Sequence, residues 1–191
     1  FIILIFFYLK LLFSQEIMFE NFDQNNSVKW KFISDQVMGG VSYGKSTFLS
    51  ENDISFVRLT GFVSLENKGG FIQIRKKIEN ENMKNIKGFK LRLRGNESTY
   101  YLHIRTHFTL LPWQYYQAKM IAKENWTDVF LDLRDFVRSG IMLPKNINPN
   151  NIKSIAVVAF GREHKVRLDI DKISCTSSKS SKNKIFLFKF N

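Results

Sequence analysis

The chain has 191 residues, with 29 Lys and Arg against 17 Asp and Glu, and a single cysteine, Cys175. This length predicts one domain with a substantial core, and a lone cysteine excludes an intrachain disulfide framework. The excess charge of +12 lies mainly in residues 75–94 and 176–191. Such localisation favours an acidic partner or an anionic membrane surface over general nucleic-acid binding.

The chain begins with an apolar run, Phe1 to Phe13, interrupted by Lys10. The run is shorter than the ~20 residues that a membrane-spanning helix needs, and its length fits the hydrophobic region of a signal peptide. We therefore expect residues 1–16 to be a signal-like hydrophobic leader. It lacks an initiator Met, and a truncated N-terminus is one interpretation of this start. The leader predicts export or peripheral attachment to a membrane.

Alternation of apolar and polar residues dominates the rest of the chain. In FKLRLRG, residues 89–95, every second residue is apolar and the others are mostly basic. Such a pattern predicts a β-strand with one buried face. Similar runs predict strands at 53–65, 70–78, 99–108, 115–122, 126–133, 154–161 and 166–173. The run at 154–161 is apolar on both faces and should be a central strand.

The only predicted helical turn lies at residues 133–140 and ends at Gly140. About eight or nine strands with almost no helix between them describe an antiparallel sandwich. The fold class predicted from these patterns is therefore all-β.

The segment Gly40–Gly44 matches G-x-S-x-G, the nucleophile elbow of serine hydrolases. An elbow needs a helix directly after the turn, and the residues that follow Gly44 have no helical periodicity. The pair Gly39-Gly40 instead suits a tight turn, with Asp35 bonding nearby backbone amides. We predict a structural corner and no catalytic residue, with a hydrolase that uses Ser42 as an alternative.

Two spaced motifs resemble a known family. The first is W-x4-D-x2-M-G-G-x-S-x-G, formed by Trp30, Asp35, Met38, Gly39, Gly40, Ser42 and Gly44. The second is N-K-G-G-F, which contains Gly69 and Gly70. Together they resemble the complex I intermediate-associated protein 30 (CIA30) family, and the likeness extends from about Phe19 to Ile173.

The resemblance implies a galactose-binding-domain-like jelly-roll β-sandwich over residues 17–175, followed by a basic C-terminal tail, 176–191. It also implies a non-catalytic, chaperone-like assembly factor that binds assembly intermediates of NADH:ubiquinone oxidoreductase (complex I), a protein partner in a partly built state. No cofactor is implied. A mitochondrial location, at the inner membrane or in the matrix, is the alternative to export.

An aromatic cluster at residues 110–119 is the predicted recognition surface. Tyr and Trp provide large contact areas with one polar group each, and they anchor interfaces and stack on sugars. We expect Trp113, Tyr115 and Tyr116 to bind a partner together with Arg105, which shares a strand face with His103. Trp113 could instead plug one end of the sandwich. A carbohydrate-binding module is the alternative function.

Metal and nucleic-acid sites are not predicted. His103 and His107 would lie ~13 Å apart along a strand, too far to share a zinc ion. Asp169 and Asp171, expected on a solvent face with Arg167, lie in no Asp-rich loop of the kind that binds calcium. The basic segment 75–94 lacks the interleaved exposed aromatic residues of a nucleic-acid surface.

Overall fold

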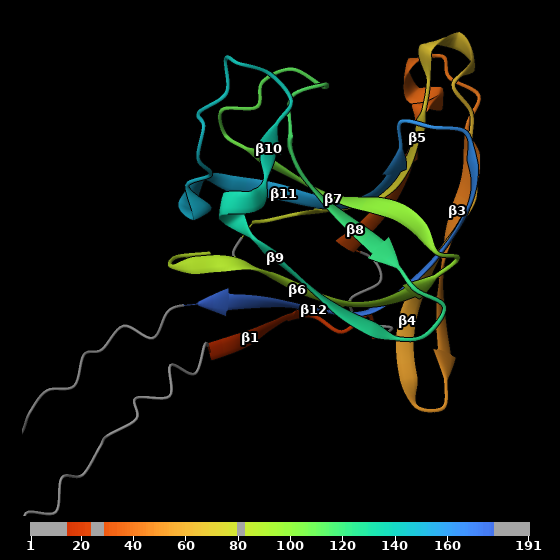
Figure 1. Cartoon of the computed structure of the whole chain (residues 1–191), viewed down its shortest axis with the longest axis horizontal. Coiled ribbons are helices and arrows are strands. Elements are labelled where there is room, and N and C mark those ends of the chain that lie inside the picture. Colours follow the sequence, from red (N-terminus) through yellow and green to blue (C-terminus); the bar gives the residue numbers. More distant parts are fainter. Residues whose placement is uncertain (1–14, 24–28, 80–82, 178–191) are drawn as a thin grey trace, which may run out of the picture.

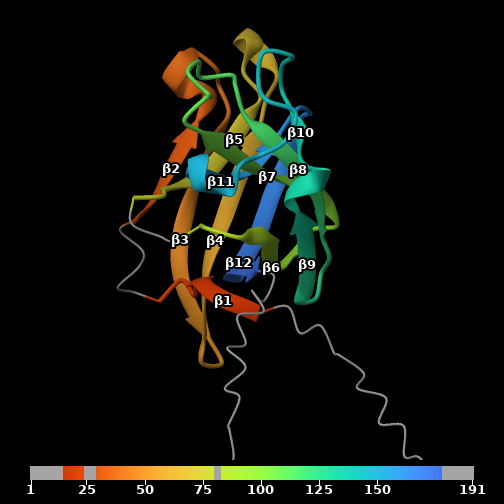
Figure 2. The same ribbon diagram turned by 90° about the vertical axis from the view of Figure 1, so that its left-hand side faces the viewer.

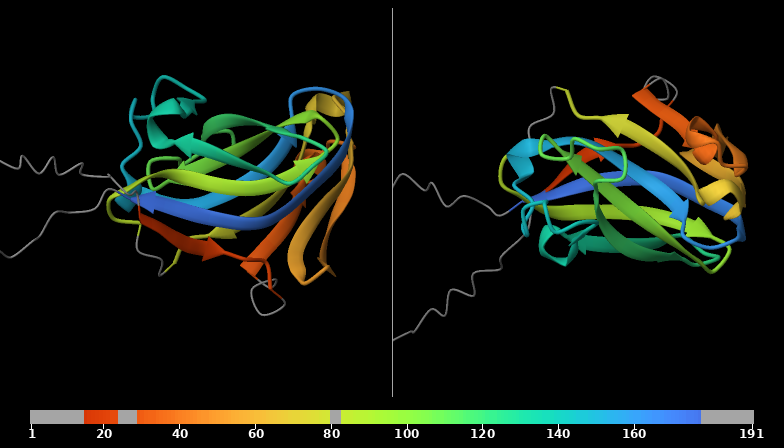
Figure 3. Two further views of the ribbon diagram at one scale, coloured as in Figure 1. Left: turned by 60° about the horizontal axis from the view of Figure 1, so that its bottom comes forward. Right: turned by 90° about the horizontal axis from the view of Figure 1, so that it is seen from above.

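The structure, a computed structural model, describes residues 15–23, 29–79 and 83–177, and in this part of the chain two antiparallel sheets pack face to face (Figures 1 and 3). The first sheet has the order β3 (Tyr43–Glu51), β4 (Ile54–Val63), β12 (His164–Ser177), β6 (Ile86–Gly95) and β9 (Thr127–Asp132), and β1 (Gln15–Glu20) also pairs with β12. The second sheet has the order β10 (Val137–Arg138), β8 (Tyr116–Ala122), β7 (Ser98–Thr106), β11 (Ile152–Phe160), β5 (Phe71–Lys77) and β2 (Trp30–Ser34).

The helical segments of the described residues are short 3-10 turns: η2 (Asp35–Met38), η3 (Glu66–Lys68), η4 (Leu133–Asp135) and η5 (Pro149–Asn151). None of the helices in the described ranges is long and apolar enough to cross a membrane. The architecture is an all-β jelly-roll sandwich, as the sequence predicts.

The predicted alternation produces the core. Leu91 and Leu93 of β6 and Ile72 and Ile74 of β5 are completely buried between the sheets. The doubly apolar strand β11 lies between β7 and β5, in the middle of its sheet, so the prediction of a central strand is confirmed. The long strand β12 shares one edge between two partners, pairing with β4 through residues 164–170 and with β1 through residues 173–177.

Several local predictions differ from the structure. Strands β1, β2 and β3 were not expected, and Gln15 and Glu16, assigned to the leader, lie in β1. The predicted helical turn at 133–140 is the 3-10 turn η4 followed by the short strand β10, because Val137 and Arg138 pair with β8. Residues 1–14 of the leader and 178–191 of the basic tail lie outside the described residues.

Asp169 and Asp171 alternate with the buried Leu168 and Ile170 and so lie on the outer face as predicted, but the prediction that they are exposed to solvent is wrong. Their side chains are only 2% and 6% exposed. Asp169 lies 2.7 Å from Arg58 and 2.9 Å from Arg94, and Asp171 lies 2.7 Å from Arg92. Burial opposes ionisation of Asp169, but hydrogen bonds from the two arginines outweigh it and lower its pKa. Lys90, Arg92 and Arg94 of β6 are therefore paired with carboxylates within the fold, so they are not a free basic surface for the acidic partner or membrane that the charge pattern favours.

A buried carboxylate at the η2 corner connects the two sheets. Asp35 is completely buried and accepts hydrogen bonds from the Ser42 amide and hydroxyl and from the Gly70 and Phe71 amides. The Ser42 hydroxyl also accepts a bond from the Ser64 amide at 3.0 Å. The network thus joins the β2–β3 connection to the β4–β5 connection, and both of these connections cross between the sheets.

The glycines of both motifs leave room for this carboxylate. A Cβ at Gly40 would lie 2.3 Å from the Asp35 carboxyl carbon, and one at Gly69 would lie 2.4 Å from a carboxylate oxygen. Gly39 has a φ of +90°, which favours glycine. The predicted structural role of the diglycine corner therefore has a physical cause in the packing around Asp35.

We predict that Asp35→Asn destabilises the fold by about 3 kcal/mol, because the new amide NH2 would face backbone donors that a carboxylate satisfies. Urea unfolding at pH 7 measures this loss. The Asp53→Asn change, at an exposed turn residue, is the matched control and should alter stability by less than about 0.5 kcal/mol. Equal stabilities of the two variants would contradict the role given to the corner.

The pH dependence of the Asp35 contribution has a defined sign. Burial raises the pKa of Asp35, but hydrogen bonds from Ser42, Gly70 and Phe71 outweigh it and hold the pKa below 3.8. The stabilisation is therefore present above the ordinary pKa and is lost as the pH falls through the lowered one.

Candidate binding cleft

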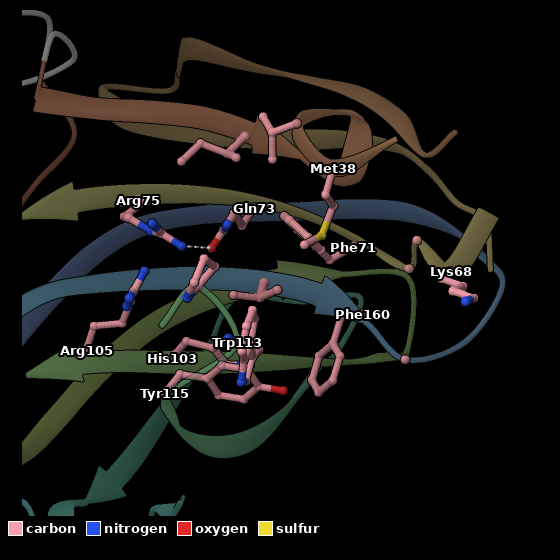
Figure 4. A pocket seen from close by; sticks show the side chains of 17 residues that line it. Met38, Lys68, Phe71, Gln73, Arg75, His103, Arg105, Trp113, Tyr115 and Phe160 are labelled. Atoms are coloured by element: carbon pink, nitrogen blue, oxygen red, sulfur yellow. Dashed lines mark hydrogen bonds between the residues drawn. The ribbon is translucent and has the colours of Figure 1, made fainter. Parts of the chain in front are cut away.

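A cleft of about 330 Å³ lies on the outer face of the second sheet (Figure 4). Its floor is formed by outward-facing side chains of β5, β11 and β7, and its walls come from η2, the β4–β5 connection and the β7–β8 loop. Its lining residues are Ile33, Val37, Met38, Lys68, Gly69, Gly70, Phe71, Gln73, Arg75, His103, Arg105, Pro112, Trp113, Tyr115, Val158, Phe160 and Gly161.

The strand register places the polar floor residues. Arg75 of β5 and His103 of β7 are both opposite Ala156 of β11, so all three lie in one row across the sheet. Arg105 lies two residues further along β7. Because successive side chains alternate between faces, these residues face out while their neighbours Ile74 and Ile104 face the core.

The β7–β8 loop places Trp113 at the cleft, and Arg105 holds that loop. The Arg105 guanidinium donates to the carbonyls of Thr109 and Leu111 at 3.1 and 2.9 Å. The Ser139 hydroxyl donates to the Trp113 carbonyl at 3.0 Å, which ties the loop to the segment after β10. Trp113 remains 63% exposed, so it does not plug the end of the sandwich.

The rings of His103 and Phe160, on the floor, and of Tyr115, beside it, form one side of the cleft, which is called the aromatic wall. The rings of His103 and Tyr115 are stacked, with centroids 4.1 Å apart and an interplanar angle of 8°. Phe160 meets the edge of His103 at 5.1 Å. Figure 4 shows Trp113 beside these two stacked rings, with Arg75 and Arg105 along the neighbouring part of the floor.

The cleft is cationic. Burial, with repulsion from Arg105 as a second cause, lowers the pKa of Arg75, and burial also lowers the pKa of Arg105. At the edge, Lys153 has a pKa lowered by burial and by both arginines. The lining residues include no Asp or Glu. The site thus concentrates positive charge without an acidic partner of its own.

His103 is neutral at physiological pH. Burial and the nearby charge of Arg75 lower its pKa from 6.5 to about 3, while Gln117 acts in the opposite direction. A neutral imidazole stacks on Tyr115 without adding a third positive charge beside Arg75 and Arg105. It serves as part of the wall.

The structure separates the residues predicted to bind a partner. Trp113, Tyr115 and Arg105 line the cleft. Tyr116 does not: its side chain is 1% exposed, and its hydroxyl donates to the Pro144 carbonyl at 2.9 Å. Its placement on the recognition surface is wrong because Tyr115 and Tyr116, as neighbours along the chain, point to opposite faces of the sheet.

Other cleft residues were missed as binding residues or were given only a structural role. Met38, Gly69 and Gly70, predicted to be structural, also line the cleft. Arg75 and Phe160 were not singled out. Alternation along β5 and β11 places both on the outer face, but only the order of strands in the sheet brings them together.

Ser42 has the surroundings of a structural residue. It is completely buried, its hydroxyl donates to Asp35, and strand β3 rather than a helix follows it. Among the residues that the structure describes, no group of three or more His, Cys, Asp or Glu side chains is arranged to hold a metal ion.

Comparison with known families matches the chain to the model of complex I intermediate-associated protein 30 (CIA30) over residues 19–170. The chain belongs to the CIA30 family. The matched range contains every residue that lines the cleft. No curated protein sequence gives a significant match.

Similar solved structures share the fold. The family 11 carbohydrate-binding module of the cellulosomal cellulase Lic26A-Cel5E of Clostridium thermocellum superposes with a TM-score of 0.70 at 11% identity, over 86% of this chain and 96% of that chain. The Clostridium thermocellum family 11 module in complex with a β-1,3-1,4-mixed-linked tetrasaccharide gives 0.67 at 11% identity, over 85% and 96%. An exo-β-agarase gives 0.55 at 9% identity, over 86% of this chain and 25% of that chain.

We predict that His103 makes the CIA30 domain less stable in mild acid. Its lowered pKa means that stability is fully present above pH 6.5 and is lost as the pH falls toward about 3. Between pH 7.5 and 5 the loss due to His103 is about 2 kcal/mol.

Urea unfolding of wild type and His103→Gln at both pH values measures this difference. The variant should lose less stability than wild type on acidification, and the exposed His107→Gln control should behave like wild type. Identical pH dependence in all three proteins would show that His103 is not held neutral by the cleft.

Proposed function

We propose that this protein is a non-catalytic, chaperone-like assembly factor that binds a partly built intermediate of complex I through the cleft. The family match over residues 19–170 carries the proposal, because it covers the whole cleft and the corner that shapes it. The buried, hydrogen-bonded Ser42 hydroxyl supports a role without hydrolase chemistry.

The surface around the cleft supports binding to a protein. Val37, Met38 and Trp113 are 75%, 56% and 63% exposed, and all three line the cleft. Ile141 and Met142, in the loop after β10, are 87% and 88% exposed. Figure 2 shows this loop, the β7–β8 loop, η2 and η3 together at the end of the molecule opposite β1. Exposed apolar side chains concentrated in this way are typical of interaction sites.

Physically, such a surface would cover an apolar patch of a membrane-arm intermediate until the proper subunit arrives. Contact with the membrane would then be peripheral, through the partner. Export, predicted from the leader, and a mitochondrial location remain two separate expectations for the compartment.

Carbohydrate binding is the second candidate. The tetrasaccharide-bound family 11 module shares the fold, and in this chain Trp113 and Tyr115 present aromatic surfaces in an open cleft. Aromatic side chains with one polar group each suit stacking on sugar rings.

We expect a tagged form of the protein to recover complex I subunits from detergent-solubilised membranes of its own source. Trp113→Ala should reduce the recovery about tenfold or more, since a central interface tryptophan contributes 2 kcal/mol or more. Its thermal midpoint should stay close to that of wild type because the side chain is 63% exposed.

Phe130→Ala is the matched control for Trp113→Ala. Phe130 is a 53% exposed aromatic residue on β9, in the other sheet, and its loss should leave recovery unchanged. Recovery of no complex I subunit, combined with specific binding on a glycan array, would replace the assembly role by the carbohydrate-binding one.

A further inference from the structure

We propose that Arg75 binds the carboxylate of an acidic side chain in a partner protein, while the aromatic wall of the cleft holds an apolar side chain next to it. The proposal deepens the assembly role proposed above and rests on it. It assigns a chemical class to the bound segment: a peptide in which Asp or Glu adjoins an aromatic or large aliphatic residue.

Arg75 has unused hydrogen-bonding capacity. One terminal nitrogen of its guanidinium donates to the Gln73 side-chain carbonyl at 3.3 Å. Its Nε is buried and makes no hydrogen bond, and no ion pair forms at Arg75 within the described parts of the chain. A buried guanidinium donor without an acceptor is costly, which favours a ligand that supplies one.

Other arginines of the domain are paired with carboxylates or with backbone carbonyls, as expected for cations that stabilise the fold. Arg58 and Arg94 both pair with Asp169, and Arg92 pairs with Asp171. Arg105 is committed to loop carbonyls. Arg75, in the same row as His103 at the floor of the cleft, has only the Gln73 side-chain carbonyl as a partner within the described ranges.

The surrounding charges make the cleft selective for an anion. Arg105 lies close enough to repel Arg75 electrostatically, and both arginines also repel the charged form of Lys153. Among the described residues, no acidic side chain lines the cleft to neutralise them. A carboxylate placed at Arg75 would meet a planar fork of donors that matches its own geometry.

The balance of donors and acceptors favours a peptide carboxylate over a sugar. Most polar side chains of the lining, namely Arg75, Arg105, Lys68 and the Trp113 indole, can only donate, whereas the Tyr115 hydroxyl and one ring nitrogen of the neutral His103 can also accept. The Gln73 carbonyl is already engaged with Arg75. A sugar hydroxyl is itself a donor and needs acceptors, whereas a carboxylate only accepts. An acidic side chain beside an apolar one therefore uses the floor and the wall together.

Size is consistent with this ligand. A volume of about 330 Å³ is at the lower end of the range for small-ligand pockets, so the cleft accommodates two adjacent side chains but not a folded domain. The exposed Met38 and Trp113 on its rim can then contact the flanking residues of the segment.

Titration of the ¹⁵N-labelled full chain with two matched peptides tests the proposal. We expect acetyl-Glu-Phe-amide to bind about tenfold more tightly than acetyl-Gln-Phe-amide, with shifts centred on β5, β7 and β11, and the preference should decrease at high salt. Equal binding of the two peptides, or shifts away from the cleft, overturns the proposal.

Three variants assign the effect to Arg75. Arg75→Gln should abolish the preference for Glu, and Arg75→Lys should retain part of it because the charge remains but the fork is lost. Lys31→Gln is the matched control: Lys31 is opposite Arg75 in the register of β2 and β5, is exposed, and should be dispensable. A preference that survives Arg75→Gln, or that disappears in Lys31→Gln, overturns the assignment.

Stability separates a binding role from a folding role. Because Arg75 has no carboxylate partner among the residues that the structure describes, Arg75→Gln should leave the thermal midpoint unchanged or raise it by a few degrees. A midpoint several degrees below that of wild type would show that Arg75 supports the fold, and it would overturn the proposal.

Two further arms distinguish the possible failures. Methyl β-D-glucuronide, compared with methyl β-D-glucoside, tests a sugar carboxylate, and tighter binding of the glucuronide than of the Glu peptide would overturn the peptide assignment.

The Arg75→Gln protein in the membrane pull-down tests the link to assembly. Full recovery of complex I subunits by this variant defeats the Arg75 proposal but leaves the assembly role, whereas peptide selectivity without any such recovery defeats the assembly role alone.

Discussion

The architecture depends on one buried carboxylate. Asp35 collects four hydrogen bonds from Ser42, Gly70 and Phe71, and it thereby joins two chain connections that cross between the sheets. A charged acceptor that is buried away from water is tolerated only because backbone and hydroxyl donors surround it. The glycines of both motifs follow from the same requirement, since a Cβ at Gly40 or Gly69 would overlap the carboxylate. The corner also forms one wall of the cleft, through Met38, Gly69 and Gly70, so the element that closes the sandwich also shapes the candidate site.

The two outer faces of the sandwich differ in whether their arginines are paired with carboxylates. On the first sheet, Arg58, Arg92 and Arg94 are matched with Asp169 and Asp171, and the guanidinium of Arg94 also lies 4.7 Å from the Trp126 ring. On the second sheet, Arg75 and Arg105 share a cleft that no carboxylate lines. Balanced charge is what a structural surface needs, and unbalanced charge at the floor of a cleft is what an anionic ligand can use. The contrast lies between two faces of one small domain, so overall basic composition does not explain it.

The likeness to carbohydrate-binding modules concerns the scaffold. At 11% identity a TM-score of 0.70 shows that the same sandwich is built from different side chains. Function resides in the residues placed on a fold, and here these are a cationic floor beside an aromatic wall. The scaffold exposes an open sheet face, and the residues on that face decide what it binds.

The amino-acid sequence determined the fold class, most of the strands and the corner, because alternation, turn residues and the motif around Asp35 act over short stretches of chain. It also pointed to Trp113, Tyr115 and Arg105, since a cluster of aromatic residues that breaks a strand pattern is visible along the chain. Only the tertiary structure decided that Tyr116 faces the core, that Asp169 and Asp171 are buried ion-pair partners, and that Arg75 meets His103 across Ala156. The physical reason is the strand order. The sheets bring β5, β11 and β7 side by side although they are far apart in the sequence, and local patterns carry no information on which strands become neighbours.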